Sequence, residues 1–211
     1  MPVDLRMLAA PEHSAVLTME MQRGIIGDLA NLRDLADEVA DLGVIERAAQ
    51  LVGAARQAGV RVVHCTAEFR PDLAGSALNS PLLAAMARLP GHLAAGTPAA
   101  QVVPALGPVD ADLVESRQHG VSPFGGTSLD VTLRNLGVST VVVAGVSVNL
   151  GVLGLAIEAV NLGYRVVVAS DAVCGFPRDY AEAVMRHSIA LVAARATVQE
   201  IITAWAETPA P

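Results

Sequence analysis

A single stretch of the chain, from Val141 to Tyr164, limits the folds that the sequence can adopt. It reads VVVAGVSVNLGVLGLAIEAVNLGY: a run of apolar residues, a turn rich in glycine, and an apolar helical segment. A strand that is apolar on both faces is typical of a parallel sheet covered by helices on both sides. The stretch therefore predicts one strand–turn–helix unit of an α/β fold.

The rest of the chain repeats this alternation. The sequence predicts strands at 14–20, 60–66, 112–117 and 164–170, helices at 44–59, 127–137, 150–163 and 178–194, and a final strand stub and helix within 196–205. Such an order predicts a Rossmann-like three-layer α/β/α fold with a central, mainly parallel sheet. Residues 71–108, rich in Pro, Gly, Ala and Leu, depart from the pattern and contain one short helix near 82–88. We interpret this excursion as a lid or an oligomer contact.

Length and composition suit one domain over residues 1–211. The chain is 53% hydrophobic and only 17% charged, against about 25% charged in an average globular domain. With so little polar surface, we expect a homo-oligomer, a dimer or a tetramer. No apolar run reaches the roughly 18 residues of a membrane span, and no signal peptide is evident. We therefore expect a cytoplasmic protein that does not bind membranes.

All 14 basic residues are arginines, and the net charge is −7. Without lysine, the chain can form neither a phosphate-binding loop of the GK[ST] type nor a Schiff base. It also lacks the basic patch of a nucleic-acid-binding protein. The two cysteines, Cys65 and Cys174, have no partner at metal-ligand spacing and suit buried apolar positions. We expect a small-molecule substrate, no cofactor and no metal.

Several polar residues follow the predicted strands. They are Glu20, Thr66, Arg117, Asp171 and the turn Ser147–Gly151. In open parallel sheets, ligands bind beyond the carboxyl ends of the strands, so these residues predict a pocket. Asp171 is also expected to cap the segment that follows it.

Three of these features suggest acid–base or electrostatic chemistry. Glu20 closes an apolar strand and could exchange a proton near neutral pH, or it could simply pair with an arginine. Arg117 could hold a substrate carboxylate with two hydrogen bonds. The amides of the turn before Gly151 could bind an oxyanion, although the glycine by itself also suits close packing.

The histidines give weaker signals. His119 could titrate near pH 7 or could be solvated in its loop. His64 and His187 suit structural positions, whereas His13 and His92 are expected at the surface.

In order, LTMEMQRG, HCTAEFRPD, SPFGGTSLDVTLRNLGVSTVVVAGV and SVNLGVLGLAIEAVNLGYRVVVASDAV resemble motifs of the isochorismatase-like (cysteine hydrolase) superfamily. The resemblance covers roughly residues 15–203. It implies an α/β/α fold, usually oligomeric, with a catalytic Asp, Lys and Cys. It also implies a non-proline cis peptide near Val146–Ser147.

The resemblance places the family's aspartate at Glu20 and its cysteine at Gly151, and its lysine falls on Arg117 or Gln118. Ser122, Pro123 and Phe124 replace the SAF motif. The chain would thus be a divergent member without the catalytic cysteine and lysine. We assign the catalytic positions to Glu20, Arg117 and Gly151. The residues assigned to substrate binding are Gln22, Thr66, Glu68, Arg70, Gln118, His119, Phe124, Ser147 and Asn149.

Three functions stay open at this point. The first is a hydrolase that uses Glu20 for acid–base chemistry, without a cysteine nucleophile, on a small carboxylate-bearing substrate with a vinyl ether or an activated C–N or C–O bond. The second is a catalytically degenerate member that binds a small molecule or stabilises a partner. The third is a nucleotide-binding Rossmann protein, which only the fold class favours.

Overall fold

The computed structural model describes residues 4–89 and 91–207. Its centre is a sheet of six strands in the order β3-β2-β1-β4-β5-β6, and every neighbouring pair is parallel. The strands are β1 (Ser14–Met19), β2 (Arg61–Ala67), β3 (Leu113–Arg117), β4 (Thr140–Val146), β5 (Arg165–Cys174) and β6 (Ala194–Ala196). The predicted α/β fold with a parallel sheet is confirmed.

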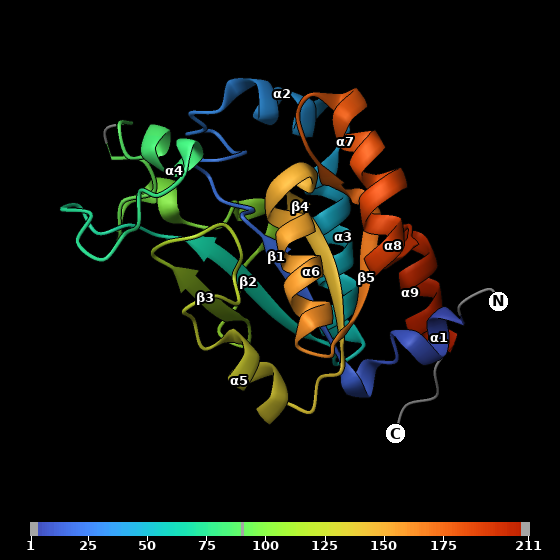
Figure 1. Cartoon of the computed structure of the whole chain (residues 1–211). Helices are drawn as coiled ribbons and strands as arrows, with labels where there is room; N and C mark the ends of the chain where they lie inside the picture. The colour runs from blue at the N-terminus through green and yellow to red at the C-terminus, as the bar shows by residue number, and fades with distance from the viewer. Residues whose placement is uncertain (1–3, 90, 208–211) are drawn as a thin grey trace.

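Helices cover both faces of the sheet (Figure 1). Helices α2 (Arg33–Asp41), α3 (Val44–Gln57) and α9 (Val198–Glu207) pack on one face with strand residues such as Val16 and Val142. Helices α5 (Leu129–Asn135), α6 (Leu153–Asn161) and α7 (Arg178–Val184) pack on the other face with Leu17 and Val143. Successive strand residues thus enter opposite cores, which is why the strands are apolar throughout.

The short elements complete the chain. They are α1 (Leu5–Leu8), α4 (Pro81–Met86), α8 (Ala190–Val192), the 3₁₀ turns η1 (Pro11–His13), η2 (Pro98–Ala100) and η3 (Pro104–Leu106), and the π-helical turns η4 (Val148–Val152) and η5 (Met185–Ile189). The excursion 71–108 contains α4, η2 and η3, and Figure 1 shows α4 beyond the arrowheads of β2 and β3. In the described part of the chain, no helix has the length and apolar character needed to cross a membrane.

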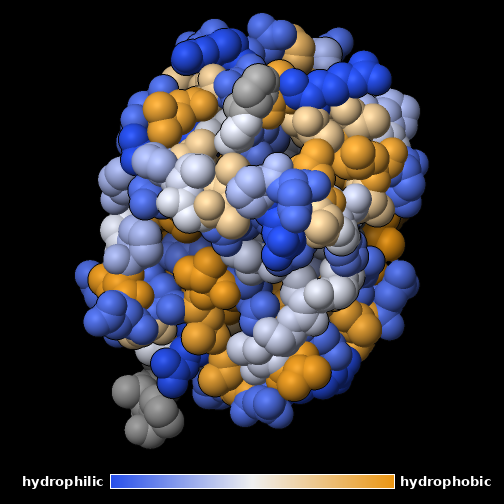
Figure 2. Space-filling model, turned by 90° about the vertical axis from the view of Figure 1, so that its left-hand side faces the viewer, coloured by the Kyte–Doolittle hydropathy of each residue, from blue (hydrophilic) through white to orange (hydrophobic). Residues whose placement is uncertain are grey.

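The surface seen in Figure 2 mixes hydrophobic and hydrophilic residues, with several separate apolar patches. Exposed apolar side chains include Leu78 and Leu82 of the excursion. Exposed apolar residues are common on protein surfaces and do not by themselves identify an interface.

Two of the differences from the sequence expectations concern residues at the starts of helices. The helix expected at 127–137 begins at Leu129, because Thr127 accepts a hydrogen bond from the Leu129 amide and stays outside the helix. Asp171 lies within β5 and accepts a hydrogen bond of 2.8 Å from the Val198 amide, so it caps the distant helix α9 rather than the segment that follows it.

A buried polar network links β1, β2 and the entry to β3. His64 is fully buried, with its Nδ1 2.8 Å from the Thr18 hydroxyl and its Nε2 3.3 Å from an Asp112 carboxylate oxygen. Arg56 donates two hydrogen bonds to Asp112. Burial lowers the pKa of His64, and the effect of Asp112 only partly offsets it. Burial would raise the pKa of Asp112, but hydrogen bonds from Arg56, the Val109 amide and His64 lower it overall.

The central strands meet at a glycine. Gly145 of β4 pairs with Met19 of β1 and has a φ of +113°. A Cβ atom at residue 145 would lie 2.8 Å from the Met19 amide nitrogen and would overlap the Met19 carbonyl oxygen. The position therefore admits glycine alone.

Gly145→Ala should lower the free energy of unfolding by roughly 3 kcal/mol or more, because the methyl group collides with the backbone and the φ angle disfavours alanine. Urea denaturation measures this change. Gly53→Ala is the matched control, because its Cβ meets nothing within 4 Å inside α3. That variant should be as stable as the wild type, or more stable by up to about 1 kcal/mol. Equal stability of the two variants would contradict the argument.

The His64 network predicts a dependence of stability on pH. The pKa of His64 is lowered in the folded state, so below pH ~6.5 the unfolded chain binds a proton more readily. The free energy of unfolding should therefore fall as the pH drops below about 6.5, by at most ~1.4 kcal/mol per pH unit from this residue. His64→Gln should reduce that slope, measured by urea denaturation from pH 7 to pH 5. His187 is exposed, so the structural position expected for it was wrong, and His187→Gln is the matched control. A slope unchanged in His64→Gln would refute this role.

Candidate functional site

Glu20 follows the last residue of β1 and lies at the carboxyl end of the sheet. Its φ of +52° is in the left-handed region, which is uncommon for a residue other than glycine. The Glu20 amide donates a hydrogen bond of 2.9 Å to the Cys65 carbonyl, which holds this conformation against β2. Unfavourable backbone angles of this kind cluster at binding and active sites. The side chain is 18% exposed.

Arg117 is the last residue of β3, which lies on the other side of β2 from β1. Its side chain extends to Glu20. Its side chain is only 6% exposed. Nη2 donates to the Glu20 carboxylate, and Nε donates to the Gly120 carbonyl at 3.2 Å. Nη1 is buried and has no hydrogen-bond partner within the described residues. The guanidinium therefore has one donor group, Nη1, for which the described residues supply no acceptor.

The turn after β4 forms the third part of the site. The Val146–Ser147 peptide bond is cis, which confirms the expectation drawn from the family resemblance. The π-helical turn Val148–Val152 then leads directly into α6. A Cβ atom at Gly151 would lie 3.0 Å from Cε of Met19 and 3.1 Å from the Val146 carbonyl oxygen. The glycine thus packs against β1. The turn around it does not have the open space of a phosphate-binding loop.

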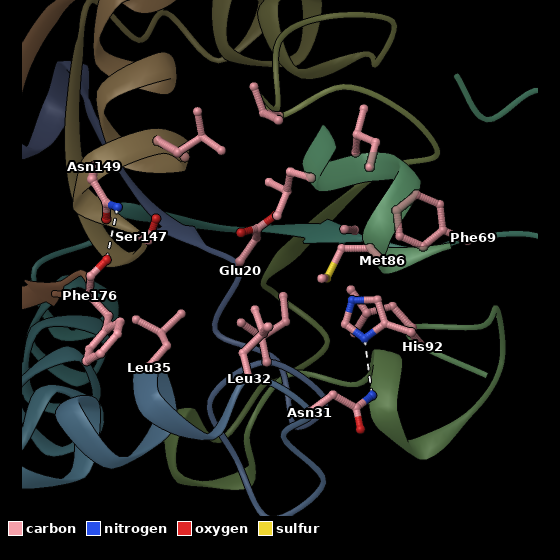
Figure 3. A pocket seen from close by; sticks show the side chains of 18 of the residues that line it. Glu20, Asn31, Leu32, Leu35, Phe69, Met86, His92, Ser147, Asn149 and Phe176 are labelled. Atoms are coloured by element: carbon pink, nitrogen blue, oxygen red, sulfur yellow. Dashed lines mark hydrogen bonds between the residues drawn. The ribbon is translucent and has the colours of Figure 1, made fainter. Parts of the chain in front are cut away.

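These three parts line one cavity of about 590 Å³. Its polar lining includes Glu20, Arg117, Ser147 and Asn149, and its apolar lining includes Ile25, Leu32, Leu35, Phe69, Met86 and Phe176. In Figure 3, Glu20 lies between Ser147 and Asn149 on one side and Phe69, Met86 and His92 on the other. The volume is in the range of small-molecule sites. Of the twelve predicted site residues, the cavity brings together Glu20, Arg117, Ser147, Asn149 and Gly151.

His92 is an unexpected member of the site. The prediction of a surface position was wrong, because the excursion folds His92 inward until it is 9% exposed. Its Nδ1 lies 3.3 Å from Nδ2 of Asn31, an amide nitrogen that can only donate. Burial lowers the pKa of His92, while the Glu20 carboxylate acts to raise it. A neutral ring that accepts at Nδ1 carries its proton on Nε2, the nitrogen that Figure 3 shows on the side of Met86.

Two predicted residues near the cavity instead hold the backbone. Gln22 is fully buried, where its side chain donates to the Ala67 and Ala100 carbonyls and accepts from the Ala67 amide. Thr66 lies 2.6 Å from the Ser116 hydroxyl, across the β2–β3 pair. Neither residue lines the cavity.

Glu68 and Arg70 also lie outside the cavity walls. Glu68 accepts a hydrogen bond from the Gly96 amide at 2.9 Å, and Arg70 forms an exposed ion pair with Asp72. The residue between them, Phe69, is the one that faces the cavity.

The segment after β3 places the remaining predicted residues elsewhere. Gln118 is exposed, and the ring of His119 packs against Gly126. Phe124 is buried in the core that α5, α6 and α7 form with the sheet, where its ring stacks on Tyr164 with centroids 5.9 Å apart. The cavity lining includes none of these three.

Many of the cavity residues that sequence reasoning missed come from two connections. Asn31, Leu32 and Leu35 lie in or before α2, and Leu83, Met86 and His92 lie in the excursion. Among the described residues, no three His, Cys, Asp or Glu side chains gather in a way that could hold a metal ion.

The family profile described as Isochorismatase domain matches residues 14–200. The chain belongs to the isochorismatase family. A full-length relative supports this assignment: the uncharacterized isochorismatase family protein YecD of Escherichia coli O157:H7 is 30% identical over 90% of this chain and 95% of its own length.

Two further relatives match this chain over shorter segments. The uncharacterized isochorismatase family protein YwoC of Bacillus subtilis is 36% identical over 49% of this chain, and the match spans only 54% of YwoC. Maleamate amidohydrolase of Pseudomonas putida is 30% identical over 63% of this chain and 60% of its own length. The chain thus spans little more than half of these two proteins.

Solved structures agree with the family fold. An isochorismatase family protein from Desulfovibrio vulgaris superposes with a TM-score of 0.79 at 26% identity, covering 93% of this chain and all of that one. A cysteine hydrolase from Pseudomonas syringae pv. phaseolicola gives a TM-score of 0.78 at 24% identity, covering 94% of this chain and 95% of that chain.

Neither cysteine of this isochorismatase-family chain lines the cavity. Cys65 is fully buried in β2, and burial raises the pKa of its thiol to about 12. Cys174, at the end of β5, is 3% exposed, and burial raises its pKa to about 11. The thiolate is the reactive form of cysteine, so both groups should be inert in the folded protein.

An Ellman reagent titration of the native protein at pH 8 should therefore release almost no chromophore. The denatured chain should react with both cysteines, which serves as the internal control. Rapid reaction of one thiol in the native state would show that burial does not protect it. The variants Cys65→Ala and Cys174→Ala would then identify which thiol reacted.

Proposed function

We propose that this protein is a hydrolase that uses the Glu20 carboxylate for proton transfer, without a cysteine nucleophile, on a small substrate that carries a carboxylate. The observation that supports the proposal is the convergence of Glu20, Arg117 and the Gly151 turn on one cavity. The family resemblance would place glycine at the position of the family's cysteine, the chain contains no lysine, and its two thiols lie outside the cavity. A hydrolytic reaction at this site would have to use water directly.

The bond to be cleaved is proposed from chemistry and from relatives together. One relative is named maleamate amidohydrolase, which favours an activated C–N bond over a vinyl ether or a C–O bond. Water would add to the carbonyl carbon while Glu20 accepts a proton from it. Glu20 would then return that proton to the leaving nitrogen as the C–N bond breaks. The products are a carboxylic acid and an amine.

The other parts of the site have roles in this scheme. Nη1 of Arg117 is the donor proposed to hold the substrate carboxylate, after a small shift that exposes it. Amides at the start of the helix that follows Ser147 would stabilise the negative charge that develops on the carbonyl oxygen. His92, neutral and donating from Nε2, could hold a polar atom of the substrate on the opposite wall.

The alternative is a degenerate family member that binds a small molecule without turnover. The Glu20–Arg117 ion pair favours it, because each group already has a partner without any ligand. The open cavity favours a ligand in either case. Maleamate and other short amides that carry a carboxylate, tested for amine release, distinguish the two functions. Binding without release would favour the alternative.

Glu20→Gln should lower kcat by roughly 100-fold or more with little change in ligand affinity, because it keeps the size and hydrogen bonding but cannot transfer the proton. Glu20→Asp should retain more activity than Glu20→Gln, since it keeps a carboxylate. Steady-state kinetics with a turned-over amide, together with calorimetric Kd values, measure both effects. Glu46→Gln, an exposed carboxylate on α3, is the matched control. Full activity of Glu20→Gln would leave Glu20 a structural role only.

A further inference from the structure

A second hollow lies directly beside the candidate site. It has a volume of about 210 Å³ and lies under α4 and the loop that follows it. Phe69, Leu83, Met86 and His92 line both this hollow and the main cavity. The two spaces are therefore separated by a single layer of side chains.

Most of the side chains that line the second hollow are apolar. Apart from the four shared residues, its lining includes Pro71, Leu73, Ala77, Leu78, Ala87 and Leu89. Among the described residues, Arg70 is the one Arg, Lys, Asp or Glu in the lining, and its guanidinium is paired with Asp72 while its side chain is 56% exposed. An apolar group would enter favourably.

The Glu20–Arg117 ion pair lines the main cavity and not the second hollow. Glu20 and Arg117 stand at the polar end, beside the Ser147 turn. Figure 3 shows Met86, Phe69 and His92 on the other side of Glu20. Met86 is unbranched and has three rotatable bonds, so it can move aside at small cost to join the two spaces.

We propose that the second hollow is a subsite for an aliphatic chain of the substrate. The substrate class is then an amphiphilic acid or acid amide: its polar head lies at Glu20 and Arg117, and its unbranched apolar chain passes Met86 and ends under α4. The position of the head rests on the proposed function, whereas the chain subsite rests on the shape and composition of the second hollow alone.

Binding of two homologous series tests the subsite by calorimetry on the full chain. The probes are the n-alkyl carboxylates from acetate to decanoate and the matching n-alkanols. Each methylene group that is buried should lower the Kd about four-fold, until the hollow is full. The same trend in the neutral alkanols would show that the chain subsite does not depend on the carboxylate head.

Ala87→Phe should fill the hollow, because residue 87 lines this space and not the main cavity. Long-chain carboxylates should then bind at least about ten-fold more weakly, while acetate and propionate bind as in the wild type. Ala85→Phe, two residues earlier and within α4, is the matched control, since residue 85 is exposed and lines neither space. Ala94→Leu provides a smaller obstruction if Ala87→Phe does not fold.

The results separate this proposal from the proposed function. A Kd that does not change with chain length, or a trend that persists in both Ala87→Phe and Ala94→Leu, overturns the subsite. A trend that the obstructing variant abolishes supports it. If the trend is present but no amide is hydrolysed, the subsite stands and the hydrolase proposal fails.

Discussion

The fold and the candidate site both depend on the close approach of the two central strands. Gly145 of β4 lies against the backbone of Met19 in β1, at a distance that leaves no room for a side chain. The residue after Met19 is Glu20, and the cis peptide and the turn begin at Val146. The contact therefore sets the spacing between the carboxylate and the turn that faces it. The geometry of an active site is sensitive to shifts of about 1 Å. A contact between two backbones, with no side chain that could adjust, fixes the spacing of Glu20 and the turn closely.

The ion pair at the end of β1 connects stability to the proposed chemistry. Arg117 is almost fully buried, and Glu20 is its charged partner. Removal of one member of a buried pair leaves the other charge without compensation, which typically costs ~3–5 kcal/mol. Conservative replacements that keep the hydrogen bond therefore separate catalysis from folding more cleanly than alanine does. The same pair brings two opposite charges to a cavity whose other walls are mostly apolar.

Sequence patterns predicted the sheet and the polar end of the site for a simple physical reason. Buried parallel strands are continuous apolar runs, and their carboxyl ends meet at one edge, so Glu20, Arg117 and the Ser147 turn had to lie near one another. The same reasoning failed at the end of β2, where it assigned Thr66 and Glu68 to substrate binding. Side chains alternate along an extended chain, so Ala67 and Phe69 face the cavity while Thr66 and Glu68 do not. His92 and Asn31 could not be predicted, because the paths of the excursion and of the loop before α2 have no periodic signature.

The packing of Gly151 on Met19 has a consequence for how this site can change by mutation. Any side chain at residue 151 would press on Cε of Met19, the residue that precedes Glu20. The size of residue 151 and the packing of the Met19 side chain are therefore not independent. A side chain at residue 151 would require the end of the Met19 side chain and the Val146 carbonyl to give way by a few tenths of an ångström. Residues 19 and 151 should show strong epistasis, although neither carries a charge.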